Sequence, residues 1–139
     1  MFPFIYTFKR TIITDKTPKN VIDTVRDSLI EKKVQDILYT NKTVYFDEGF
    51  LKARSNNDYL AMIDNGKFIY DEESRVLTYK VKLWRLNIIA IVLGIFTCIY
   101  FDGFFGKSIP FLGLIVNHLF SYFGSQGLIN EISHKLNYL

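Results

Sequence analysis

The chain has 139 residues, enough for one domain with a short extension, and its charges are unevenly divided. Residues 1–85 hold 15 of the 17 lysine and arginine residues and 12 of the 14 acidic residues, whereas Asp102 and Lys107 are the only formal charges in residues 86–130. The single cysteine, Cys98, excludes an internal disulfide framework, a cysteine-based zinc site and a CxxC redox centre. A pI near 8.9 is too mild for a dedicated nucleic-acid arm. The division of charge predicts a polar domain followed by an apolar region.

The first elements predicted along the chain are a strand and a helix. Residues 4–13 are rich in β-branched and aromatic side chains, which favour a half-buried strand. A helix over about residues 18–33 follows, because Thr17 can cap its first turn and Pro18 suits its first position. One stripe of this helix is apolar and consists of Val21, Ile22, Val25, Leu29 and Ile30.

Short strands are predicted after this helix. They lie around residues 37–39, 43–46, 67–70 and 75–83, with a further candidate at 50–54. Asp64-Asn65-Gly66 is a turn signal, and the last strand alternates apolar and polar side chains, which indicates one buried face. The sequence therefore predicts an α+β domain over residues 1–85, in the order β-α-β-β-β-β, with one helix lying on an antiparallel sheet.

The apolar region predicts a two-helix transmembrane hairpin over residues 86–130. Its two uncharged runs are residues 86–101 and 108–130, joined by a glycine-bearing loop at 102–107. The tail, residues 131–139, has helical apolar spacing and either continues the second helix or lies at the membrane interface. A buried hairpin inside an oligomer is the alternative interpretation.

Charged and aromatic residues beside the first run predict the orientation of this hairpin. Lys80, Lys82, Trp84 and Arg85 are expected at the membrane interface, and the positive-inside rule then places both termini in the cytoplasm. The expected localisation is the inner (cytoplasmic) membrane.

Small and polar residues within the apolar runs are candidate site residues. Ala90, Gly94 and Cys98 recur at every fourth position, which favours close helix packing, either within the hairpin against Gly113 or against a partner. Asn87, Asn117 and His118 are the predicted intramembrane polar residues. They could line a pore, or His118 could relay a proton; a single interhelical hydrogen bond that fixes register is the simpler interpretation.

The sequence predicts no catalytic residues, no metal site and no cofactor. It contains no glycine-rich phosphate loop, no Ser/His/Asp order and no HExxH motif, and Asp71-Glu72-Glu73 is typical of a solvated turn. We therefore expect a protein that is not an enzyme and does not bind nucleic acid. A small-molecule ligand is left open.

The leading hypothesis is a small integral membrane protein that acts as a scaffold, adaptor or accessory subunit. Its expected partners are the lipid bilayer and either a second copy of the chain or another membrane protein. The alternatives are a membrane-anchored sensor of a small ligand or lipid, and an oligomeric pore-forming effector.

Overall fold

The computed structural model describes residues 5–48 and 58–139, and in that part it is an α+β fold. The elements are β1 (Ile5–Thr11), α1 (Pro18–Glu31), β2 (Asp36–Tyr39), β3 (Thr43–Asp47), a short 3-10 helix η1 (Tyr59–Met62), β4 (Asn65–Asp71), β5 (Val76–Lys82), α2 (Trp84–Tyr100) and α3 (Phe104–Tyr138). The predicted α+β class is confirmed. The strand candidate at residues 50–54 lies outside the described residues.

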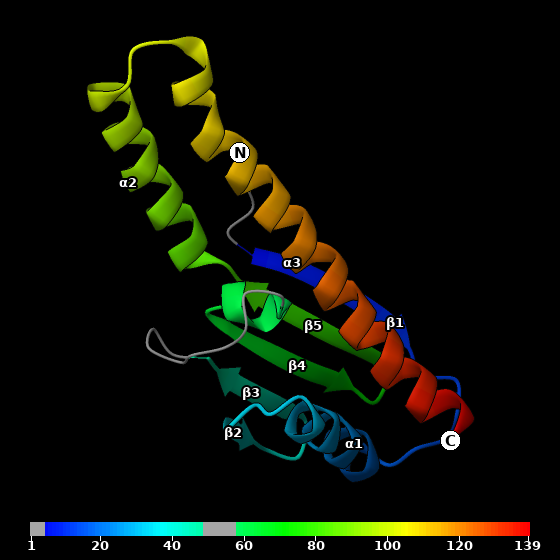
Figure 1. Cartoon of the computed structure of the whole chain (residues 1–139). Coiled ribbons are helices and arrows are strands. Elements are labelled where there is room, and N and C mark those ends of the chain that lie inside the picture. The colour runs from blue at the N-terminus through cyan, green and yellow to red at the C-terminus, as the bar shows by residue number, and fades with distance from the viewer. Residues whose placement is uncertain (1–4, 49–57) are drawn as a thin grey trace.

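Five strands form one antiparallel sheet in the order β1-β5-β4-β3-β2 (Figure 1). Tyr79 of the inner strand β5 lies opposite Phe8 of β1 and Phe68 of β4, and its ring stacks on Phe68 with the centroids 4.1 Å apart. Along β5, Tyr79 is buried whereas Lys80 and Lys82 are exposed, because side chains of a strand point alternately to opposite faces. One face of the sheet therefore carries the core.

Helix α1 covers the β2–β4 side of this core face. The Thr17 side chain accepts a hydrogen bond from the backbone N–H of Asn20 (3.3 Å), as the predicted cap requires. Four residues of the predicted stripe are buried, whereas Ile30 is exposed. The helix ends at Glu31 rather than near residue 33 because Lys33 takes a left-handed conformation, which directs the chain toward β2.

The C-terminal half of α3 covers the β1 side of the same face, beside α1. Leu128, Ile129, Ile132 and Leu136 all belong to the buried core. Two ion pairs join the helices, from Lys32 to Glu131 (3.0 Å) and from Lys135 to Glu31 (2.6 Å). The sequence predicted one helix on the sheet, so this second helix is an addition, and the apolar spacing of the tail reflects packing in the core.

Helix α2 and residues 104–123 of α3 form a two-helix arm (Figure 1). The two helices contact each other and project away from the sheet beyond the end of β5. The turn between them contains Gly103, whose φ of 121° lies in the region that favours glycine. We call this unit the arm.

The prediction that residues 86–130 form a transmembrane hairpin is wrong. In the described ranges, 5–48 and 58–139, no helix is both long enough and apolar enough to cross a bilayer. The 17 residues of α2 span about 25 Å at 1.5 Å per residue, against a hydrocarbon core of about 30 Å. The 35 residues of α3 are long enough, but Lys107, Asn117 and His118 interrupt its apolar half.

The predictions that depended on membrane insertion are corrected by the same finding. An integral membrane scaffold, adaptor or accessory subunit, a membrane-anchored sensor and a pore-forming effector are not supported, and neither is an integral inner-membrane localisation with both termini cytoplasmic. The error came from counting uncharged residues. The absence of formal charge does not by itself make a helix apolar enough, because polar, uncharged side chains such as Asn117 and His118 lower the mean hydropathy of α3.

Candidate functional site

The arm carries most of the exposed apolar surface of the described chain. Twenty-two large apolar side chains between Trp84 and Phe123 are exposed, compared with seven elsewhere in residues 5–48 and 58–139. Both helices are apolar around most of their circumference, so packing them against each other buries only part of that surface. At about half exposure and roughly 200 Å² for each side chain, the exposed apolar area of the arm is on the order of 2,000 Å².

A groove of about 600 Å³ runs between the two helices of the arm. Its α2 side contains the small residues Ala90, Gly94 and Cys98, and its α3 side contains Phe111 and Leu114. A Cβ atom added at Gly94 would meet no atom within 4 Å, so α3 does not fill the space beside this glycine. The groove is therefore open to a further apolar element.

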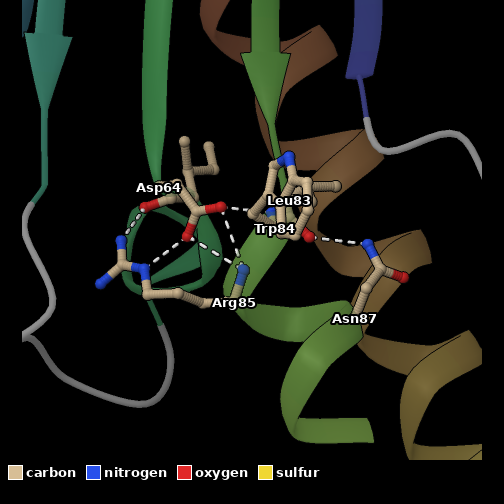
Figure 2. Close-up of polar contacts among 6 residues, drawn as sticks. Asp64, Leu83, Trp84, Arg85 and Asn87 are labelled. Atoms are coloured by element: carbon tan, nitrogen blue, oxygen red, sulfur yellow. Dashed lines mark hydrogen bonds and ion pairs between the residues drawn. The ribbon is translucent and has the colours of Figure 1, made fainter. Parts of the chain in front are cut away.

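The base of α2 is fixed by Asp64, which lies in the turn before β4. Its carboxylate accepts hydrogen bonds from the backbone N–H groups of Trp84 and Arg85, the latter at 3.1 Å, and from the Arg85 guanidinium (Figure 2). The guanidinium also donates to the backbone oxygen of Ile63 at 2.9 Å. Leu83, at the N-cap position, offers no side-chain acceptor, so Asp64 supplies from another segment the negative charge that a helix N-terminus favours.

A buried hydrogen-bonded chain connects β1, α3 and α2. The Asn87 side-chain amide donates to the backbone oxygen of Leu83 at 2.6 Å (Figure 2), so the side-chain oxygen of Asn87 faces His118 Nε2 at 3.0 Å. Because that oxygen can only accept, Nε2 carries the proton, and Nδ1 accepts from the Tyr6 hydroxyl at 2.8 Å. His118 is 5% exposed and Asn87 4%. This relay and the Asp64–Arg85 pair together form what we call the polar base.

Burial favours the neutral forms of the two titratable side chains in the relay, His118 and Tyr6. It lowers the pKa of His118 below its ordinary value of 6.5, because the buried site disfavours the imidazolium. Burial, with the charge of Tyr122 as a smaller cause, raises the pKa of Tyr6. At neutral pH the ring nitrogens of His118 are occupied by hydrogen bonds, so this arrangement suits the positioning of helices better than proton abstraction.

Comparison with protein-family models, with curated proteins and with solved structures gave no match. Function is therefore inferred from the geometry of this chain. Among residues 5–48 and 58–139, no three histidine, cysteine, aspartate or glutamate side chains lie close enough together to hold a metal ion.

The structure brings together some of the residues singled out from the sequence and separates others. Asn87 and His118 meet in the relay, whereas Asn117 is half-buried on α3 and has no hydrogen bond to the relay. Ala90, Gly94 and Cys98 share the groove, but Gly113 does not line it. The four residues expected at a membrane interface are dispersed. Lys80 and Lys82 lie on the outer face of the sheet, the Trp84 side chain is exposed, and Arg85 pairs with Asp64.

Two residues of the polar base were missed as site residues from the sequence. The sequence pattern places Asp64 in a turn signal and Tyr6 within the aromatic-rich first strand, and it indicates a site at neither position. A signal for Asp64 does exist, because Leu83 is a poor N-cap and the start of α2 needs an acceptor from elsewhere. For Tyr6, the alternation of the strand indicates the buried face and nothing about its partner.

Proposed function

We propose that this chain is a non-enzymatic self-association module whose binding element is the arm. The observation that carries the proposal is the apolar area of the arm. Monomeric proteins rarely expose a contiguous apolar patch above roughly 600 Å², and a standard interface needs about 800 Å² from each partner. The exposed apolar area of the arm, on the order of 2,000 Å² over its several faces, is large enough to supply such an interface, and its exposed aromatic side chains are of the kind enriched at interfaces.

The proposed partner is a second copy because the arm requires an uncharged, apolar complement. Between Arg85 at the base of α2 and Phe123 on α3, the charged residues are Asp102 in the turn and Lys107 in the first turn of α3, both at the tip, so the sides of the arm offer no charge for a polar partner to pair. The same arm on a second copy supplies a matching surface of equal length. Two such surfaces related by a twofold axis form a closed interface, which is the commonest symmetry of soluble oligomers.

The polar base supports this proposal by holding the arm in one position relative to the sheet. Asp64 fixes the start of α2, and the relay fixes α2 to α3 and to β1. An interface element that is already ordered loses less conformational freedom when it binds than a mobile one. The α+β domain thus acts as the rigid support of the arm.

Analytical ultracentrifugation of the full chain tests the proposal. We expect a concentration-dependent mass of at least twice the 16.3 kDa of one chain. The arm variant changes four exposed apolar residues to asparagine, at Ile95, Ile99, Leu112 and Val116. The control variant makes the same change at four exposed apolar residues of the domain, at Ile13, Ile30, Leu38 and Tyr39.

The arm variant should sediment as a monomer, whereas the control variant should associate like the wild type. Far-UV circular dichroism of both variants reports whether each is folded. A wild-type chain that stays monomeric at every concentration, or a folded arm variant that still associates, would show that the proposal is wrong.

A further inference from the structure

We propose that the groove between α2 and α3 is the seat for the arm of a second copy, so that two arms combine into a four-helix bundle. This inference rests on the proposed function and adds to it which face of the arm makes the contact. The face of the arm between its two helices is hollowed into the groove of about 600 Å³. A smaller pocket of about 370 Å³ lies at the base of the arm, beside Tyr6 and His118, and involves α3 but not α2. We therefore infer from the shape of the arm which of its faces contacts the second copy.

The shape of the groove suits an inserted apolar side chain. The α2 wall of the groove is low over two helical turns because it consists of the small residues Ala90, Gly94 and Cys98. Phe111 and Leu114 form the opposite wall. A partner side chain entering beside Gly94 would contact both helices, in the way that a knob fits into a hole in helix bundles. The arm already presents isoleucine side chains at the edge of the groove, Ile91, Ile95 and Ile99, and a second copy presents the same three.

The amount of buried area favours a second copy over a small ligand. A groove of about 600 Å³ would accommodate a drug-sized molecule, but such a molecule would leave most of the roughly 2,000 Å² of the arm exposed. A second arm covers the groove and the flanking apolar side chains at once. Beyond Arg85, which pairs with Asp64 at the base of α2, the formal charges as far as Phe123 are Asp102 and Lys107 at the tip, so like charges do not oppose this contact along the sides of the arm.

Two glycines of the arm provide a matched pair of variants. A Cβ atom added at Gly94 or at Gly113 would meet nothing within 4 Å, so a substitution at either position begins in open space in the single chain. Gly94 lines the groove and Gly113 does not. We expect Gly94→Leu to weaken association about tenfold or more, because its side chain fills the seat, and Gly113→Leu to change it by less than about twofold.

The only cysteine gives an independent readout. Cys98 is exposed in the single chain and lines the groove. We expect its alkylation by N-ethylmaleimide to slow as the protein concentration rises, because the partner arm covers it. The control is Cys98→Ala combined with Ile89→Cys, which places the thiol on the opposite face of α2, where alkylation should stay fast at every concentration.

The outcomes separate this inference from the proposed function. Association that Gly94→Leu and Gly113→Leu affect equally, with Cys98 reactive at all concentrations, would overturn the groove and leave self-association in place. A chain that is monomeric throughout would overturn both. Flotation of that monomer with phosphatidylcholine vesicles would then assign the apolar surface to lipid contact.

Discussion

Replacing Asp64 by alanine should destabilise the fold clearly more than removing the exposed carboxylate of Asp15. The substitution removes the acceptor for two backbone N–H groups at the start of α2 and the partner of Arg85. Loss of a helix cap costs about 1 kcal/mol, and loss of hydrogen bonds between charged groups costs about 1.5–3 kcal/mol. Both partners are largely buried, with side chains 12% and 23% exposed, so solvent screens the pair only in part.

These contributions share atoms and do not add fully, so we expect a loss of about 3 kcal/mol in the free energy of unfolding. With an unfolding entropy of about 2.1 cal/mol/K for each of 139 residues, this corresponds to a fall in Tm of about 10 °C. Urea and thermal unfolding, followed by far-UV circular dichroism at one fixed protein concentration, measure both values. The concentration must be fixed because self-association would also shift the transition.

The matched control is Asp15→Ala, which also removes one negative charge. Asp15 pairs with Arg75 at 3.0 Å, but its side chain is 93% exposed, and exposed ion pairs contribute little to stability. Its unfolding midpoint should therefore stay close to that of the wild type. Equal midpoints for the Asp64 and Asp15 variants, or a loss below about 1 kcal/mol at Asp64, would refute the capping role.

Three further predictions concern α3. Burial lowers the pKa of His118 below 6.5, so the unfolded chain binds the proton more tightly. The wild type should lose stability as the pH falls from about 7 through 6.5, and His118→Leu should lack this dependence in thermal unfolding at several pH values. Gly124→Ala should destabilise by about 1–3 kcal/mol, because its Cβ would lie 2.3 Å from the Tyr59 ring; Gly127→Ala, which meets nothing within 4 Å, should stabilise by up to about 1 kcal/mol in urea unfolding. Ser121→Ala should leave Tm unchanged or raise it, because its buried hydroxyl has no hydrogen-bond partner among the described residues; a fall in Tm would contradict this.

Local sequence patterns were sufficient to predict much of the α+β domain. The start of α1 follows from Thr17 and Pro18, and the buried face of β5 follows from its alternation. Both signals depend on residues that are neighbours in the sequence. The second helix on the sheet was not predicted, because the apolar spacing after Leu128 fits a membrane interface and a protein core equally well.

The candidate site could be predicted only in part, because its contacts join distant segments. Asp64 and Arg85 are 21 residues apart, and Tyr6 and His118 are 112 residues apart. Asn87 and His118 were singled out because both are polar within apolar runs, and the structure places them in one relay. The open space beside Gly94 depends on the angle between two helices, which no pattern in a single sequence records.

The continuity of α3 has a mechanical consequence for any assembly of this chain. One unbroken helix of 35 residues, about 52 Å long, runs from the tip of the arm to the core beneath the sheet. Pro110 lies in the second turn of this helix, and beyond it no linker separates the arm from the core, so a movement of the arm is passed directly to the helix that packs on the sheet. Two copies joined by their arms would therefore hold their two sheets at a defined distance and angle. Any two partners bound to the two α+β domains would be held at a defined separation as well.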